Sequence, residues 1–170
     1  MLIRQATQHD IGRLVEIDRD AYGQTGADKN YFSKKINSFP QGVLVVEENK
    51  QVTGFIVFDM LSEGNIPEDF CDMHISEPIK GKWIYIAAFT TKTNYKDKES
   101  DSKLLLAAEN VAKKLGCVES CVPLSIEHPY KNNGVFEFWE MNGYKKDGKI
   151  KWKVNEEEFV ECWFYRKELT

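Results

Sequence analysis

The stretch from Lys82 to Gly116 constrains the fold more than any other, because it predicts a buried strand, a polar connector and a long helix in succession. The apolar run 83–89 is typical of a strand that is buried on both faces. After the connector 90–100, apolar residues recur at the spacing of a core-facing helix: Leu104, Leu105, Ala108, Val111, Ala112 and Leu115. Either Ser100 or Asp101 can cap the start of this helix. A strand, loop and helix in this order can present backbone N–H groups to an anion.

Length and composition predict one globular domain over residues 1–170. The chain is 42% hydrophobic and 29% charged, which is ordinary for a folded protein. Its net charge of −4 is spread over mixed acidic and basic residues, which argues against a nucleic-acid or anionic-membrane partner. No apolar run reaches the ~18 residues of a membrane span, and the first residues do not resemble a signal peptide. We therefore expect a cytoplasmic protein.

Four cysteines are present, at positions 71, 117, 121 and 162. None forms a C-x-x-C pair, and Cys117 and Cys121 have no second cluster of Cys or His to complete a zinc site. We expect free thiols and no metal site.

The remaining pattern predicts helices packed on a mostly antiparallel sheet. Strands are expected at 2–6, 42–47, 51–58, 83–89 and 120–127, with two more near the end of the chain; helices are expected at about 10–22, 28–37, 101–115 and 132–142. One β-α-β crossover surrounds the central helix. Gly54 indicates a bulge or a close backbone approach, and Pro123 a break in strand pairing. The pattern fails at about 62–81, where a loop of roughly 20 residues is either a functional lid or an insertion.

Several phrases, in this order, resemble the GNAT superfamily of acyl-CoA-dependent N-acyltransferases. The opening Ile3-Arg4-Gln5-Ala6-Thr7 and the hairpin around Gly54 are similar to family phrases. The late phrase from Ile126 to Tyr144 matches without a gap, including Phe138-Trp139 and Gly143-Tyr144. The resemblance covers nearly the whole chain. It implies an α/β (α+β) GNAT-like fold with a mostly antiparallel sheet of six to seven strands and about four helices.

The resemblance also implies acetyl-CoA as the acyl donor. In the family, backbone groups of the fourth strand pair with the pantetheine arm, which corresponds here to Phe89, Thr90 and Thr91. The family signature for the pyrophosphate falls on the segment 96–101, where Glu99 and Asp101 replace two small residues. The cofactor-binding residues implied in this way are Lys96, Lys98, Glu99, Ser100, Asp101 and, on the next helix, Asn132.

The catalytic groups that the resemblance implies are replaced in this sequence. Trp139 stands where many members carry a tyrosine that protonates the leaving thiolate, and the run 83–91 contains no carboxylate base. Our candidates for acid–base work are His128, which can titrate near neutral pH, Tyr130 as a proton donor and Glu127 as a water-linked base. Each can equally be a structural residue.

Three functions remain open from the sequence. The first is acetyl transfer from coenzyme A to an amine of a small molecule or a protein. The second is a GNAT-fold binding or regulatory domain without catalysis, which the exchanged glycines and the tryptophan favour. The third is an acyltransferase that uses another donor or a repositioned coenzyme. The sequence does not identify the acceptor, and a monomer or a homodimer is expected.

Overall fold

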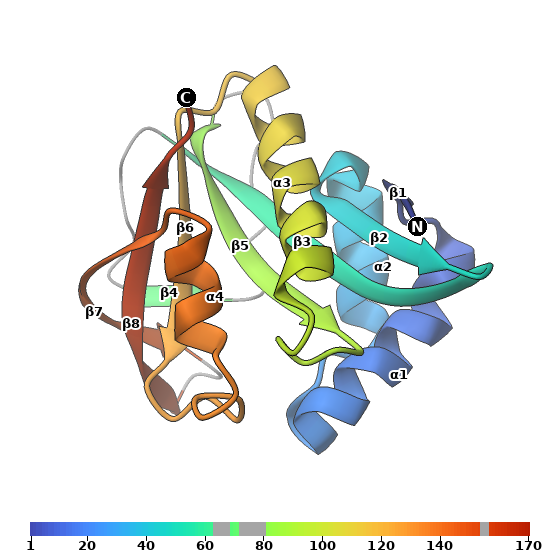
Figure 1. Cartoon of the computed structure of the whole chain (residues 1–170), viewed down its shortest axis with the longest axis horizontal. Helices are drawn as coiled ribbons and strands as arrows, with labels where there is room; N and C mark the ends of the chain where they lie inside the picture. Colours follow the sequence, from blue (N-terminus) through green and yellow to red (C-terminus); the bar gives the residue numbers. More distant parts are fainter. Residues whose placement is uncertain (63–68, 72–80, 154–156) are drawn as a thin grey trace.

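The computed structural model describes residues 1–62, 69–71, 81–153 and 157–170, which form a mixed sheet with helices on both faces (Figure 1). The strands are β1 (Leu2–Gln5), β2 (Val43–Glu48), β3 (Gln51–Ser62), β4 (Asp69–Cys71), β5 (Gly81–Thr91), β6 (Glu119–Ser125), β7 (Lys145–Lys153) and β8 (Phe159–Glu168). The helices are α1 (Ile11–Tyr22), α2 (Lys29–Ser38), α3 (Lys98–Lys114) and α4 (Val135–Met141), with 3-10 turns at Gln8–Asp10, Gly23–Thr25 and Pro40–Gly42.

The sheet has the strand order β1-β2-β3-β5-β6-β8-β7-β4. Neighbours are antiparallel except β5 with β6 and β4 with β7. The parallel pair β5–β6 is joined through α3, which confirms the predicted crossover and the mostly antiparallel α/β class. One strand of the sheet was not predicted: β4 falls inside the segment 62–81, which the sequence predicts as a loop. Three residues are too few to show an alternating pattern. The rest of that loop lies outside the described residues.

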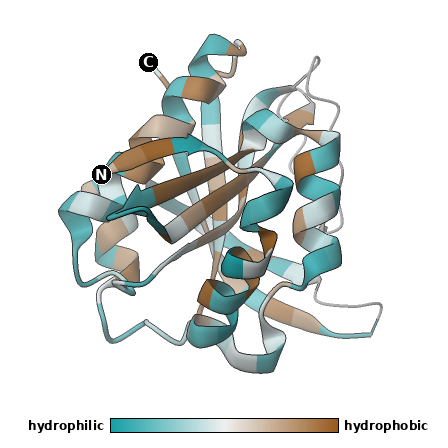
Figure 2. Ribbon diagram, turned by 90° about the vertical axis from the view of Figure 1, so that its right-hand side faces the viewer, coloured by the Kyte–Doolittle hydropathy of each residue, from teal (hydrophilic) through white to brown (hydrophobic). Residues whose placement is uncertain are grey.

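Two cores lie on opposite faces of the sheet. On one face α1 and α2 bury Leu14, Ile17 and Phe32 against the inward side chains of β2 and β3. On the other face α3 and α4 bury their apolar stripes, including Leu104 and Phe138, against β5, β6 and β8. Figure 2 shows the hydrophobic residues gathered on the central strands and on the helix faces turned toward them. The predicted stripe of the helix at 101–115 is therefore confirmed.

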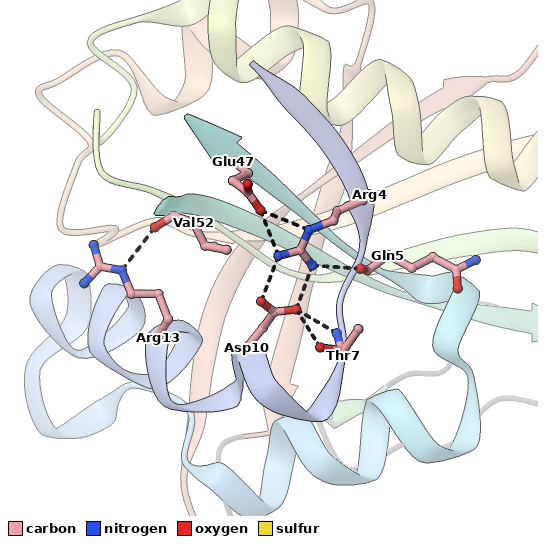
Figure 3. Close-up of polar contacts among 7 residues, drawn as sticks. All are labelled: Arg4, Gln5, Thr7, Asp10, Arg13, Glu47 and Val52. Carbon is pink, nitrogen blue, oxygen red and sulfur yellow. Dashed lines mark hydrogen bonds and ion pairs between the residues drawn. The ribbon is translucent and has the colours of Figure 1, made fainter. Parts of the chain in front are cut away.

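The N-terminal strand is tied to the first helix by a charged cluster (Figure 3). The Arg4 guanidinium donates to the Asp10 carboxylate at 2.8 and 3.0 Å and to Glu47 on β2 at 3.0 Å. The same Asp10 carboxylate accepts the backbone N–H of Thr7 at 2.7 Å, which completes a capping box. The Arg4 hydrogen bond keeps the pKa of Asp10 below its ordinary value. This cluster fixes where α1 begins.

Gly54 makes the close approach that its position in a strand predicts. A Cβ atom at this residue would lie 2.8 Å from Cγ2 of Thr91 and 3.1 Å from Cγ1 of Val46. The register between β2 and β3 also shifts beside it, between Val46 and Glu47. A glycine is needed here because β2, β3 and the end of β5 meet without room for a side chain.

The last helix is shorter than predicted. The sequence places its start at Asn132, but α4 begins at Val135. Gly134 has a φ of 86°, a left-handed conformation that cannot belong to a right-handed helix. Asn132 therefore lies in the turn before α4. Gly143, with a φ of 87°, ends the helix region as predicted.

Of the cysteines, Cys117, Cys121 and Cys162 are free and buried, and burial raises the pKa of Cys117 to about 11. The described residues hold no cluster of His, Cys, Asp and Glu suited to a metal ion. Among these residues there is also no helix long and apolar enough to cross a membrane.

Candidate active site at the divergence of two strands

The two central parallel strands pair only at one end. β5 pairs with β6 through Trp83, Ile84 and Tyr85, and beyond Tyr85 the described chain offers β5 no partner on that side up to Thr91 (Figure 1). Pro123 lies on β6 just past the last paired residue, Cys121, and a proline has no N–H to continue the ladder. The predicted break in pairing is therefore where the strands separate. It leaves one edge of β5 with backbone groups that need hydrogen-bond partners.

Aromatic rings from five segments meet at this open end. Tyr95 in the loop after β5 contacts Phe89 with a centroid distance of 6.0 Å, Phe138 on α4 at 5.3 Å and His128 after β6 at 6.1 Å. Tyr22 at the end of α1 lies 5.8 Å from the His128 ring. Tyr95 has a positive φ of 67°, which turns the loop so that its ring enters the protein, where it is only 5% exposed.

A chain of polar groups runs through the same region. Asp18 on α1 is buried, and its carboxylate accepts the Thr90 hydroxyl at 2.8 Å and the backbone N–H of Ala27 at 2.6 Å. Burial raises the pKa of Asp18 despite these two bonds. The Tyr22 hydroxyl lies 3.3 Å from Nε2 of His128. Burial and then the Asp18 charge raise the pKa of Tyr22, so this phenol keeps its proton at neutral pH.

His128 occupies the centre of the site, and its hydrogen bonds define its tautomer. Its Nδ1 accepts the backbone N–H of Tyr130 at 3.1 Å, so in the neutral ring the proton sits on Nε2. Nε2 then donates to the Tyr22 oxygen. Burial lowers the pKa of His128 to about 4, which leaves the ring neutral at pH 7. The arrangement presents a neutral imidazole N–H and a phenol O–H side by side.

Trp139 contributes a buried N–H donor to the same region. The side chain is 1% exposed, and its Nε1 has no well-aligned hydrogen-bond acceptor among the residues that the structure describes. The indole N–H faces the Tyr95 hydroxyl: burial raises the pKa of this hydroxyl well above 10, and the interaction with the indole N–H works against that rise. An unpaired buried donor costs about 1–3 kcal/mol, so such donors are rare unless a ligand accepts from them.

The start of α3 differs from its predicted arrangement. The cap is Asp97, one turn earlier than Ser100 or Asp101, and its carboxylate accepts the Ser100 backbone N–H at 3.1 Å. Asp101 turns inward instead: it is 2% exposed and accepts the Thr93 hydroxyl at 2.7 Å. Glu99 points to solvent, where it pairs with Lys103 at 3.4 Å.

The other predicted site residues surround the open end at different depths. Thr90 and Thr91 are buried, Phe89 joins the ring cluster, and Tyr130 donates its hydroxyl to the carbonyl oxygen of Ala21 at 3.3 Å. Glu127 is exposed and forms an ion pair with Lys131. Lys96 and Asn132 are exposed. The amine of Lys98 lies against Gly134: a Cβ atom built on that glycine would be 2.8 Å from Nζ of Lys98.

A hollow lies at the opposite end of β6. Its volume is about 620 Å³, and Glu119, Asp147 and Arg166 line it. Arg166 donates to Glu119 at 2.9 Å and to Asp147 at 2.7 Å, so these charges are paired with one another. We therefore place the candidate site at the open end of β5 and β6.

Comparison with known proteins rests on structure alone, since neither a scan against protein-family models nor a search of curated proteins finds a match. GphF, a GNAT-like decarboxylase solved in complex with isobutyryl-CoA, superposes over 100% of both chains with a TM-score of 0.81 and 12% identity. The loading GNATL domain of CurA from Lyngbya majuscula gives 0.80 at 13% identity, covering 99% of this chain and 97% of that one. A ribosomal-protein-alanine N-acetyltransferase from Brucella melitensis gives 0.69 at 17% identity, covering 99% and 100%.

The chain has the GNAT fold. The resemblance found in the sequence is thereby confirmed for the architecture. In this fold the fit of coenzyme A can be tested at two places. The unpaired edge of β5 and the Trp139 N–H offer hydrogen bonds to a pantetheine arm and its thioester. At the start of α3 the Asp97 carboxylate already caps the first turn. The pyrophosphate of the coenzyme is therefore poorly matched to this helix N-terminus.

Sequence reasoning missed Asp18, Tyr22 and Tyr95 as members of the site. Asp18 lies 72 positions before Thr90 and Tyr22 lies 106 before His128, so no local spacing joins them. One signal was available: Asp18 falls next to Ile17 on the apolar stripe of the predicted helix, where a carboxylate needs a buried partner. Tyr95 was visible only as a residue of the polar connector.

Proposed function

We propose that this protein transfers an acyl group, most simply acetyl, from a coenzyme A-type thioester to an amine. The observation that carries this proposal is the unpaired edge of β5 between Ile86 and Thr91, beside buried polar groups from α1, α4 and the segment after β6. An extended pantetheine arm can pair with such an edge as an added strand would. The acceptor is a small molecule or a protein that carries a primary amine.

Positioning supplies most of the rate enhancement in this proposal. The amine nitrogen attacks the thioester carbonyl carbon, a C–N bond forms, the C–S bond breaks, and the proton lost by the amine ends on the thiolate. Backbone N–H groups of β5 stabilise the negative charge that develops on the carbonyl oxygen. Holding both reactants at contact distance lowers the barrier without a strong base. This suits a β5 strand that has no carboxylate from Gly81 to Thr91.

His128 and Tyr22 serve proton transfer in this scheme. The neutral ring of His128 donates from Nε2 to Tyr22, so the Tyr22 hydroxyl is free to donate its own proton to the leaving sulfur. The Nε2–H of His128 stabilises the phenolate that forms, and the proton lost by the attacking amine restores the phenol, so that the net transfer is from the amine to the thiolate. The backbone N–H of Tyr130 supports the pair by donating a hydrogen bond to Nδ1 of His128. Glu127, an exposed carboxylate next to His128, is the water-linked base for the ammonium form of the acceptor.

Decarboxylation is a second candidate, favoured by the similarity to GphF and by the absence of a carboxylate from β5. A thioester whose α carbon carries a carboxylate would lose carbon dioxide as the bond between that carbon and the carboxylate breaks. The electron pair would pass into the thioester enolate, and the α carbon would take a proton from the Tyr22–His128 pair. This reaction needs a proton donor, which the Tyr22–His128 pair supplies, and it needs neither a base nor an amine.

Acetyl-CoA binding by calorimetry, followed by amine-dependent release of free thiol, tests the main proposal. We expect saturable binding and thiol release that depends on the amine. His128→Gln should lower turnover about 100-fold because the proton donor pair is broken. The matched control is His9→Gln, an exposed histidine far along the chain from the site. Release of carbon dioxide from malonyl-CoA without an amine would favour the second candidate. Binding with neither reaction would instead favour a non-catalytic domain.

A further inference from the structure

The first turn of α3 holds a carboxylate of the chain itself. The Oδ1 of Asp97 accepts the Ser100 N–H at 3.1 Å, and the Asp97 carbonyl oxygen accepts the Asp101 N–H at 3.0 Å. The Ser100 N–H is one of the groups that a helix N-terminus offers to an anion, whereas the Asp101 N–H makes the first bond within the helix. A phosphate at this position would have to displace the carboxylate or lie beside it.

The loop before α3 uses its own amides as well. The N–H of Asn94 bonds to the carbonyl oxygen of Thr91 at 3.2 Å, and the N–H of Lys96 bonds to that of Thr93 at 3.0 Å. The buried Asp101 carboxylate holds the loop through the Thr93 hydroxyl. No glycine occurs between Phe89 and Gly116, although Asn94 and Tyr95 both have positive φ angles. The loop therefore holds its shape through its own contacts, and side chains occupy its whole length.

Charge adds to this mismatch. Asp97 and Glu99 place carboxylates on the first turn of α3, and the Asp97 charge adds to burial in raising the pKa of Asp101. The ammonium of Lys98 is directed toward Gly134 at the start of α4. One carboxylate about 4 Å from a phosphate weakens binding by a factor on the order of 10 to 1,000, depending on the effective dielectric constant between 80 and 20.

The opposite end of the site keeps its binding groups. The β5 edge from Ile86 to Thr91 has no strand partner among the described residues, and the buried Trp139 N–H has no well-aligned acceptor there. Both groups lie where an arm and its thioester would be held. We propose that the physiological donor is an acyl group on a pantetheine arm, recognised without the pyrophosphate and adenosine of coenzyme A. This inference rests on the proposed function and names its donor class. Such an arm exists as a small thioester and as the phosphodiester-linked arm of a carrier protein.

Binding of pantetheine, coenzyme A and adenosine 3′,5′-bisphosphate, measured by calorimetry on the full chain, tests this inference. We expect pantetheine to bind within about threefold of coenzyme A and adenosine 3′,5′-bisphosphate not to compete at millimolar concentration. Coenzyme A affinity 30-fold or more above that of pantetheine would overturn the inference and leave the proposed function standing. Failure of all pantetheine compounds to bind at millimolar concentration would overturn both.

A pair of cap variants isolates the role of the carboxylate. Asp97→Ser keeps a capping hydroxyl and removes the charge, so it should raise coenzyme A affinity about tenfold and leave pantetheine affinity unchanged. The matched control is Asp28→Ser, because Asp28 caps α2 with the same bond, to the Tyr31 N–H at 2.8 Å. Unchanged coenzyme A affinity in Asp97→Ser would contradict the inference.

A loaded carrier protein distinguishes the two sources of the arm. If the pantetheine-bearing carrier binds more tightly than free pantetheine, the donor is carried on a protein. If it binds equally or more weakly, the donor is a small pantetheine thioester. The unloaded carrier, which lacks the arm, is the control for contacts with the carrier surface alone.

Discussion

At the residue scale, His128 shows how burial selects one protonation state. Its ring is 8% exposed and its Nδ1 accepts a backbone N–H, and both of these favour the neutral form. Burial lowers its pKa from 6.5 to about 4. Because the pKa in the folded state is the lower one, the stability that His128 contributes is present above pH 6.5. It is lost as the pH falls toward 4.

This shift predicts an acid sensitivity that belongs to one side chain. Between pH 7.5 and 4.5 the free energy of unfolding should fall about 2–3 kcal/mol more in the wild type than in His128→Gln. Urea unfolding at the two pH values measures the difference. Carboxylates such as Asp18 and Asp101 titrate in both proteins, so they cancel in the comparison. An equal pH dependence in both proteins would show that His128 is not buried in its neutral form.

At the scale of elements, the site depends on how closely β2, β3 and β5 approach one another. Gly54 on β3 leaves room for Thr91, and the Thr91 hydroxyl lies 2.9 Å from that of Thr93 in the loop toward α3. The position of this loop, and with it that of Tyr95, therefore depends on a packing contact in the sheet.

Replacing this glycine should be costly, and a second substitution should relieve the cost. Gly54→Ala places a Cβ 2.8 Å from Cγ2 of Thr91, so we expect a loss of about 1–3 kcal/mol in the free energy of unfolding. Thr91→Ser removes that methyl group and keeps the hydroxyl. The double variant should recover about half of the loss, measured by denaturant unfolding as a double-mutant cycle. Additive losses would place the strain elsewhere, for example at Val46.

At the scale of the whole molecule, one strand edge is the place where a ligand would complete the sheet. β5 is paired with β3 along its length, and its other edge is unpaired past Tyr85 in the described part of the chain. We expect pantetheine at saturation to slow amide hydrogen exchange in the segment 86–91. Exchange in β2, at 43–48, should not change, because that strand is paired on both sides. Protection of both segments alike would indicate general stabilisation without a ligand in the gap.

The sequence by itself determined the elements and much of their order. The period of Leu104, Leu105 and Ala108 fixed α3 and its buried face, and the apolar run 83–89 fixed the central strand. Gly54 and Pro123 marked a close approach and a break in pairing, because the lack of a side chain or an N–H acts locally. Local signals of this kind need no knowledge of the rest of the chain.

Only the tertiary structure decided which polar groups meet. Asp18 and Thr90 are 72 positions apart, and Tyr22 and His128 are 106 apart, yet each pair shares a hydrogen bond. The cap of α3 is Asp97, whereas the sequence predicts Ser100 or Asp101. Asp101 is buried instead, where its carboxylate accepts the Thr93 hydroxyl. Folding brings such groups together by burying the apolar faces around them. Their contacts therefore follow from packing, and no residue spacing in the sequence predicts them.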